Sequence, residues 1–520
     1  MNGEMHPTRW GDPASASDLP AETRGFVENA LGIRDTPAVA NATVPASGLS
    51  PQLIGDLREL LGAQHVHTRD GLRQLRTRGK STPDLLRARS GDLTDAPDVV
   101  AQPATHADVE ALIEFAIRHH VALVPFGGGT SVTGGLVADR DGYAGVVSVD
   151  MARMKSVRDI DTVSMTAVLE PGLRGPEAEA ALAEYDLMLG HYPQSFEYAS
   201  VGGFTATRSS GQASAGYGRF DSMVVGLTVA TPQGTWELGT APASGAGPDL
   251  RQLILGSEGA FGIITSVRVR VKALPAERVY EAWQFDSFAE GTDAMRYLAQ
   301  HQLMPTVCRL SDEFETMFNL AGQSSIDDDA SGGCLMIVGY EGASVAERRA
   351  QVSEALSNRD GTALGQPRGI AWEKGRFHGP YLRDSLLDVG VLVETLETAT
   401  FWSNVEHVYS AVQEALAADI GEQGFLLCHI SHIYETGCAL YFTVAVSGFE
   451  EPLQQWREAK ARVSQAIIDA GATITHHHAV GTDHKPWYAQ EIGPVGTSIL
   501  RAIKTELDPT GVLNPGVLIP

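Results

Sequence analysis

The sequence predicts a mixed α+β fold built from more than one structural unit. Three observations support this: a β–α–β order of patterns over residues 97–149, three glycine-rich segments between residues 125 and 265, and alternating strand and helix patterns after about residue 276. A chain of 520 residues exceeds what one hydrophobic core usually supports. We therefore expect two or three structural units.

The first 95 residues predict a helical N-terminal extension. They mix Pro, Ala, Gly and charged residues, and the apolar spacing over residues 51–61 indicates a helix. Within this region, Gly79-Lys80-Ser81 is similar to the end of a phosphate-binding loop. The upstream glycine of such a loop is missing and no strand precedes it, so we expect an exposed basic turn and no ATP site.

Residues 96–275 predict a nucleotide-binding unit. A helix pattern over residues 107–120 leads into the apolar run 121–124 and then into the glycine loop 125–136, and strand patterns follow at 145–149 and 165–172. Three successive glycines, Gly127 to Gly129, allow backbone N–H groups to come close to a ligand where any Cβ would block approach. Such a loop can hold a pyrophosphate, although an isolated glycine run is more often a structural turn.

Two further segments suggest that one extended ligand spans this unit. Residues 193–211 contain Gly202 and Gly203 among small side chains. Residues 256–265 contain Gly256, Gly259 and Gly262 and run into the alternating strand pattern 267–271.

Residues 276–490 predict an α/β cap, in which strand patterns at 334–340 and 439–446 alternate with helix patterns at 345–357 and 451–470. Tyr441 lies in one of these strand patterns, where a core role is the commoner one. His476, His477 and His478 are consecutive, so at most two can point to one spot if the segment is extended. A zinc site or an ordinary polar loop is the alternative use of such a cluster.

Charge and cysteine content limit the possible partners. The formal net charge is −25, which disfavours nucleic acid and anionic membrane surfaces. A phosphate-bearing substrate would then need arginines that reverse the local potential. Four scattered cysteines form no CxxC spacing and no disulfide framework, and no signal peptide or spanning segment is visible. A cytoplasmic location and no metal are expected.

Together, Pro-Phe-Gly-Gly-Gly-Thr-Ser at 125–131, Ser-Val-Gly-Gly-Phe at 200–204 and Gly-Ser-Glu-Gly at 256–259 resemble the flavoproteins with a vanillyl-alcohol-oxidase (PCMH) type FAD-binding domain. Within that family, their order and spacing are most similar to the alkyldihydroxyacetonephosphate synthases (alkylglycerone-phosphate synthases) and their bacterial relatives. The resemblance runs from about residue 70 to the end. It implies an FAD-binding domain over 96–275, a substrate-binding cap over the flavin at 276–490, and a segment 491–520 that returns to the FAD domain.

The resemblance also implies the FAD-binding residues, which fall in the three glycine-rich segments. They are Pro125, Phe126, Gly127, Gly128, Gly129, Thr130 and Ser131 in the first; Pro193, Gln194, Ser195, Phe196, Glu197, Tyr198, Ala199, Ala206, Thr207, Arg208 and Ser209 in the second; and Glu258, Gly259, Ala260, Phe261, Gly262, Ile263 and Ile264 in the third. No histidine lies in 125–136, so the FAD is expected to be non-covalent.

By the same resemblance, Tyr441 and His476 to His478 are catalytic and exchange protons with the substrate, Arg309 is needed for activity, and Arg383 binds the substrate phosphate. A tyrosine with an ordinary pKa near 10 needs cations or hydrogen bonds to lower it, and we expect Arg383 or a histidine to do so. The implied reaction belongs to ether lipid synthesis. It replaces the acyl chain of acyl-dihydroxyacetone phosphate by a fatty alcohol through a flavin N5 adduct, without net redox change.

Two rival functions stay open. An FAD-dependent 2-hydroxy-acid dehydrogenase or oxidase of the glycolate or D-lactate type would share the FAD domain and use Arg309 or Arg383 for a carboxylate. That group typically carries a His-x-Gly-Asp-Gly-Asn-x-His segment, which residues 428–437 lack. The other rival is a flavoprotein that binds without turnover. The family suggests a homodimer acting on a small phosphate- or carboxylate-bearing substrate.

Overall fold

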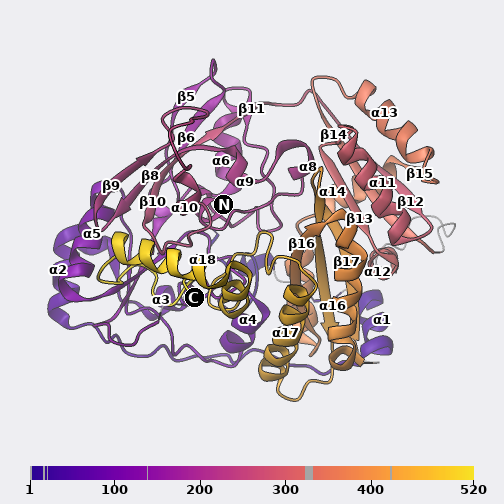
Figure 1. The fold of residues 1–520 in the computed structure, drawn as a ribbon. Helices are drawn as coiled ribbons and strands as arrows, with labels where there is room; N and C mark the ends of the chain where they lie inside the picture. The colour runs from indigo at the N-terminus through magenta and orange to yellow at the C-terminus, as the bar shows by residue number, and fades with distance from the viewer. Residues whose placement is uncertain (1–2, 16–17, 20, 138, 322–331, 422–423) are drawn as a thin grey trace.

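The computed structural model describes residues 3–15, 18–19, 21–137, 139–321, 332–421 and 424–520. Figure 1 shows two lobes, with the sheets of the N-terminal half in one and a large sheet in the other. Helix α18 (Lys485–Leu507) brings the C-terminal end of the chain back across the first lobe. None of the helices described is long and apolar enough to span a bilayer.

The first lobe contains a four-stranded sheet in the order β1-β2-β4-β3. Strands β2 (Val99–Ala101) and β3 (Ala122–Phe126) run parallel to β4 (Val146–Asp150), with α5 (His106–His119) between β2 and β3 in sequence. The predicted β–α–β order is therefore confirmed. Helix α2 (Pro51–Leu61) packs into the same core, and β1 (Val66–His67) pairs with β2. The N-terminal region thus adds a strand to this sheet.

The second sheet of this lobe is antiparallel and has five strands. Its order is β5 (Val157–Asp161), β6 (Thr166–Leu169), β10 (Ile263–Arg270), β8 (Val224–Thr231) and β9 (Gly234–Leu238). Strand β10 carries the alternating pattern expected from residue 267 onward. Near the C-terminus, Leu513 forms a β-bridge with Leu123 and Asn514 donates its backbone N–H to the Leu123 carbonyl. The chain therefore returns to the first lobe.

The cap is a seven-stranded sheet in the order β15-β12-β14-β13-β17-β18-β16. Its strands are β12 (Glu277–Phe285), β13 (Val307–Ser311), β14 (Cys334–Gly342), β15 (Thr362–Gly365), β16 (Leu392–Phe401), β17 (Gly424–Ile433) and β18 (Gly437–Val446). Leu440, Phe442 and Val444 pack with residues of the covering helices α11 (Phe288–Gln300), α13 (Ala346–Ser357), α16 (Val405–Ile420) and α17 (Pro452–Asp469). Because strand side chains alternate, Tyr441 and Thr443 face the opposite side, toward a cavity.

The remaining elements are shorter connections. They are α1 (Ala21–Leu31), α3 (Asp70–Leu75), α4 (Thr82–Arg89), α6 (Gly175–Ala183), β7 (Leu187–Met188), α7 (Val201–Ala206), α8 (Ser214–Tyr217), α9 (Phe220–Met223), α10 (Arg251–Ile254), β11 (Lys272–Ala273), α12 (Glu313–Ala321), α14 (Gln366–Gly375) and α15 (Gly379–Asp388). Helix α1 packs against residues of the cap, among them Leu386 of α15 and Val393 of β16. The predicted boundaries at 95, 275 and 490 stay predictions, and α18 runs across the last of them. All four cysteines are buried, and none is in a disulfide.

Candidate active site

A cavity of about 460 Å³ lies between the glycine-rich segments of the first lobe and the open face of the cap sheet. Most of the predicted cofactor residues line it. These are Pro125, Phe126, Gly127, Gly128, Gly129, Thr130, Ser131, Pro193, Gln194, Ser195, Ala199, Ala206, Thr207, Ser209, Glu258, Gly259, Gly262, Ile263 and Ile264. The three segments therefore form one wall of a single cavity, as a shared extended ligand requires.

The first glycine loop is packed tightly and has unused backbone donors. A Cβ on Gly127 would lie 2.2 Å from Ser200 Oγ, and one on Gly128 would lie 2.0 Å from the Tyr198 carbonyl oxygen. Glycine is therefore required for the first and second segments to meet. Among the described residues, none accepts a hydrogen bond from the backbone N–H groups of residues 128–132. These adjacent donors suit an anion such as a pyrophosphate.

Six predicted cofactor residues lie outside the cavity lining. Two of them make aromatic contacts: Phe196 stacks on Phe377, and Tyr198 packs against Trp10. Glu197 accepts a hydrogen bond from the Tyr381 hydroxyl, and Arg208 forms an ion pair with Asp221. Ala260 and Phe261 belong to the hydrophobic core. Their neighbours in sequence line the cavity, so the contacts of these six side chains with the rest of the protein hold the glycine-rich segments in place.

Glu258 links the third segment to the loop that follows the histidine triplet. Its carboxylate accepts the backbone N–H groups of Val480 and Gly481 at 3.1 and 2.8 Å. Burial raises the pKa of Glu258 to about 7, against which these two hydrogen bonds act. This residue therefore positions the loop of the cap against the cofactor end.

The histidine triplet is held by one buried carboxylate, that of Glu397 on β16. The Glu397 carboxylate accepts hydrogen bonds from the backbone N–H groups of His476, His477 and His478, at 2.6, 3.2 and 2.9 Å. It also accepts a hydrogen bond from the Thr475 hydroxyl. Burial raises its pKa, but the neighbouring His477 and His478 together with these hydrogen bonds lower the pKa to about 2. At neutral pH the side chain is therefore an anion, and its hydrogen bonds hold the turn.

The three histidines have different surroundings. His477 and His478 line the cavity, whereas His476 does not and instead contacts the Tyr434 hydroxyl. The expectation that at most two histidines face the cavity is met, although the segment is a bend and not an extended strand. Burial lowers the pKa of His478 to about 3 and also lowers that of His477, so both imidazoles are neutral.

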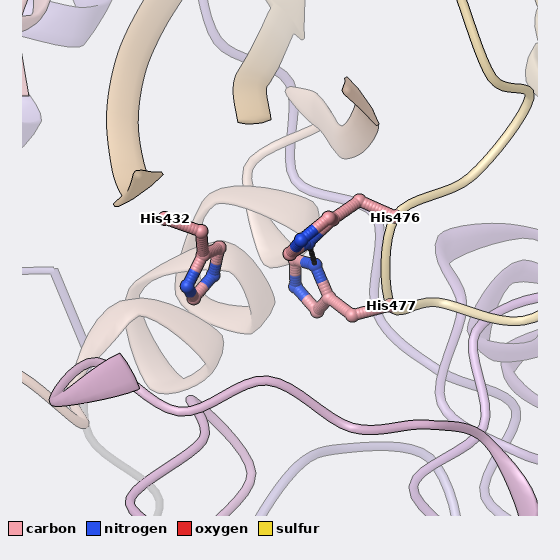
Figure 2. A group of neighbouring side chains, drawn as sticks. All are labelled: His432, His476 and His477. Carbon is pink, nitrogen blue, oxygen red and sulfur yellow. Dashed lines mark hydrogen bonds between the residues drawn. The ribbon is translucent and has the colours of Figure 1, made fainter. Parts of the chain in front are cut away.

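Figure 2 shows His476 and His477 facing His432 of β17. Their nitrogens lie within 4.8 Å of one another, and His476 Nδ1 is 2.9 Å from His477 Nδ1. The hydroxyl oxygens of Ser210 and Ser214 lie 3.0 and 2.7 Å from His432 Nδ1, within hydrogen-bond distance. The three imidazoles are the group within the described chain that could ligate a metal ion, and the expectation of no metal stays a prediction.

Tyr441 lies between two histidines at the cavity wall. Its ring stacks on the rings of His429 and His477, with distances between ring centroids of 4.7 and 6.0 Å. Burial raises the pKa of Tyr441 to about 12, despite a hydrogen bond from Thr395 and the charge of Arg309. The expectation that Arg383 or a histidine lowers this pKa is therefore wrong, because desolvation dominates and Glu394 and Glu397 oppose ionisation. Tyr441 therefore keeps its proton at neutral pH.

Arg309 supports this stack through an ion pair. It pairs with the buried Glu315, and its Nη2 lies 3.0 Å from His429 Nδ1, which is 2.9 Å from Glu315 Oε2. Burial raises the pKa of Glu315, but His429 and Arg309 lower it well below its usual range. Arg309 lines the cavity, and the contacts of its Nη2 with Glu315 and His429 position the His429 ring.

Arg383 and Lys80 form the cationic end of the cavity. Arg383 donates to Asp384 at 2.9 Å and to the Lys80 carbonyl oxygen at 2.6 Å. Both residues line the cavity. Lys80 is only 7% exposed, so the expected exposed basic turn at residues 79–81 is wrong. Gly79 lies directly against the Ser131 carbonyl, which explains why the turn is buried beneath the first glycine loop.

Several residues of the site are not predicted from the sequence. Glu397, His429 and His432 lie in apolar strand sequences, where a buried polar side chain is costly unless it has partners, and this was the available signal. Glu315 and Trp10 carry no such signal, because each reaches the cavity only through the fold, and the Gly79-Lys80-Ser81 motif does not by itself place Lys80 at the cavity.

The comparisons with known proteins agree with this geometry. A family model described as an FAD binding domain matches residues 97–239, and one described as the C-terminal domain of FAD linked oxidases matches residues 274–518. The cofactor that fits the glycine-rich end is thus FAD. The predicted FAD-binding domain with a cap is confirmed.

Two relatives resemble the chain over nearly its whole length. The alkyldihydroxyacetonephosphate synthase of Dictyostelium discoideum is 32% identical, over 97% of this chain and 88% of that protein. A solved structure of alkyldihydroxyacetonephosphate synthase superposes with a TM-score of 0.87 at 30% identity and covers 99% of both chains. The mitochondrial cytochrome-dependent D-lactate dehydrogenase of Arabidopsis thaliana is 27% identical, over 82% of this chain and 74% of that protein.

Proposed function

Because the chain belongs to the FAD-linked oxidase family and is a relative of the alkyldihydroxyacetonephosphate synthases, we propose that it is an alkylglycerone-phosphate synthase-like transferase of ether lipid synthesis. The reaction exchanges the acyl chain of acyl-dihydroxyacetone phosphate for a fatty alcohol. The C1–O bond to the acyl group breaks, a C1–O bond to the alcohol oxygen forms, and the alcohol proton leaves with the fatty acid. No net oxidation occurs.

The observation that carries this proposal is the single cavity that joins the glycine-rich segments to Tyr441, His477, His478 and Arg383. Exchange at C1 requires a base that takes a proton and an acid that returns one. His477 and His478 are neutral at pH 7 and can accept a proton at a ring nitrogen. Tyr441 retains its proton and can donate it from the phenolic oxygen.

The backbone N–H groups of residues 128–132 and the lining residues of all three segments would hold the FAD. When bound, the flavin supplies the ring whose electronic flexibility allows the C1–O bond to be broken and remade. The protein supplies proton donors and acceptors, a positive end for the phosphate, and a cap that limits water. Non-covalent FAD, a homodimer and a cytoplasmic location remain predictions.

The test is an anaerobic turnover assay on the purified yellow protein. Palmitoyl-dihydroxyacetone phosphate with hexadecanol should give hexadecyl-dihydroxyacetone phosphate and palmitate with no lasting loss of flavin absorbance. In parallel reactions, D-lactate, glycolate or D-2-hydroxyglutarate should leave the flavin oxidised. Flavin bleaching by a hydroxy acid, with no ether product, would reject the transferase and favour a dehydrogenase like the D-lactate relative.

A further inference from the structure

The N-terminal segment 3–11 ties the two lobes together beside the cavity. On the first lobe, Glu4 forms two hydrogen bonds of 2.8 Å with Arg76, and Arg174 donates to the Gly3 carbonyl at 2.7 Å. On the cap, the backbone N–H of Trp10 donates to Asp384 of α15. The segment is therefore anchored at both ends, and it brings Trp10 to the cavity wall.

Gly11 and His6 shape this segment. The His6 N–H donates to the Gly11 carbonyl at 2.8 Å and closes a tight loop. Gly11 has a φ of 77°, and a Cβ there would lie 2.4 Å from the Tyr381 ring of α15. The segment is thus fitted against the helix that carries Arg383, and not merely laid over the surface.

Trp10 and Arg383 both line the cavity and both retain an unused donor. Trp10 is 5% exposed, and its indole Nε1 is buried without a hydrogen-bond partner among the described residues. Arg383 Nη2 is also buried and also lacks a hydrogen-bond partner among the described residues. A buried donor without a partner destabilises the fold unless a ligand accepts from it. Two such donors on neighbouring wall residues indicate a ligand rich in acceptor oxygens.

Lys80 adds a positive charge to these donors. Its Nζ donates to the His6 carbonyl at 2.6 Å and has no ion pair among the described residues. Burial lowers the pKa of Lys80 to about 8, which nearby Asp384 and Asp84 partly oppose and Arg383 reinforces. Counted by formal charges, Lys80 and Arg383 against Asp384 leave this cluster one positive charge inside a chain of net charge −25.

We propose that Trp10, Lys80 and Arg383 together form the subsite for the substrate's phosphate dianion, and that the N-terminal segment completes it. The inference rests on the proposed function, because it takes a phosphate ester as substrate. The donor set favours phosphate over carboxylate, since the donors come from three separate elements and a phosphate dianion offers three acceptor oxygens where a carboxylate offers two. Lys80 and Trp10 are then residues that select the substrate.

The pyrophosphate of FAD is the competing ligand for Lys80, because the Lys80 N–H donates to the Ser131 carbonyl of the first glycine loop at 2.7 Å. The Trp10–Asp384 and Arg383–Asp384 contacts instead place the cluster on α15, which belongs to the cap. The test must therefore measure the FAD content and substrate affinity separately.

The experiment is calorimetric titration of the FAD-loaded protein with dihydroxyacetone phosphate, inorganic phosphate and uncharged dihydroxyacetone. The wild type should bind dihydroxyacetone phosphate and respond weakly to dihydroxyacetone. Lys80→Met should weaken dihydroxyacetone phosphate binding about tenfold, and Trp10→Phe, which removes only the N–H, about threefold. FAD per protein should stay at the wild-type value. Exposed Lys374→Met and half-buried Trp236→Phe are the matched controls and should bind like the wild type.

Unchanged affinity in both variants would overturn the inference. Loss of FAD with normal phosphate affinity in the loaded fraction would also overturn it and would assign Lys80 to the cofactor. A wild type that binds dihydroxyacetone phosphate through Trp10 and Lys80 but forms no ether product would keep the subsite and reject the proposed reaction. A wild type that binds neither dihydroxyacetone phosphate nor inorganic phosphate would reject the subsite, whatever the turnover assay shows.

Discussion

The two ends of the cavity present different kinds of groups to a ligand. At the glycine-rich end, consecutive backbone N–H groups in residues 128–132 provide the donors, and the side chains there are small or absent. At the cap end, the groups that line the cavity are partly buried side chains such as Tyr441, Arg383 and His477, brought together from separate elements. The first end depends on the path of one loop, whereas the second depends on side-chain chemistry.

This difference predicts which property each kind of substitution should change. Adding a Cβ to the loop changes the shape of the backbone and should affect FAD retention. Removing a functional atom at the cap end should leave FAD in place and affect turnover. If substitutions at the two ends had the same effects on FAD content and turnover, the two ends would not be separable.

The largest effect is expected for Tyr441→Phe. The substitution removes the proton donor but keeps the ring that stacks on His429 and His477. Turnover should fall by about 10² to 10⁴-fold, the usual contribution of a general acid. FAD content and melting temperature should match those of the wild type. Equal loss of FAD would show that the two ends are not separable, and nearly normal turnover would remove Tyr441 from the catalytic group.

Glu397→Gln should destabilise the fold at the cap end. A buried anion that accepts three backbone N–H groups is replaced by an amide that offers one acceptor oxygen and a surplus donor. Breaking such a network costs about 3 to 5 kcal/mol. Denaturant unfolding measures the loss, with exposed Glu406→Gln on α16 as the control. If Glu397→Gln unfolds at the wild-type denaturant concentration, Glu397 does not hold the histidine turn.

Gly128→Ala tests the opposite end. The added Cβ would lie 2.0 Å from the Tyr198 carbonyl oxygen, and backbone on both sides must move, at a cost of about 1 to 3 kcal/mol. We expect weaker FAD retention on gel filtration and unchanged phosphate affinity in the fraction that keeps its flavin. Gly55→Ala on α2, where nothing lies within 4 Å of the added Cβ, is the control and should retain FAD fully. Retention of FAD by Gly128→Ala would reject the tight approach of the two segments.

The same difference explains what the sequence could reveal. The glycine loop is local, so its spacing after a strand pattern was sufficient to locate it. The resemblance to known proteins supplied Tyr441, Arg383 and the histidine triplet. Glu397, Lys80 and Trp10 function through contacts with residues more than 70 positions away, and no local pattern specifies such contacts. The pKa of Tyr441 was wrongly anticipated for the same reason, because burial is a property of the fold.

The smallest effect is a pH dependence that Glu397 should impose on stability. Its pKa is about 2 in the folded protein against an ordinary value of 4.5, so the unfolded chain binds its proton more readily. The stabilisation is complete above pH 4.5 and is lost as the pH falls toward 2. Between pH 5 and 3 the wild type should lose about 2 kcal/mol of unfolding free energy through this group alone.

Glu397→Gln should lose that much less over the same interval, since it has no proton to gain. Chemical denaturation at pH 5, 4 and 3 compares the two proteins, and the difference between their slopes isolates this carboxyl group from the other acidic residues. Parallel slopes would mean that Glu397 is not held as an anion in the fold. The cap end would then position its histidines by packing, and its contrast with the backbone-based FAD end would be smaller than the hydrogen bonds of Glu397 indicate.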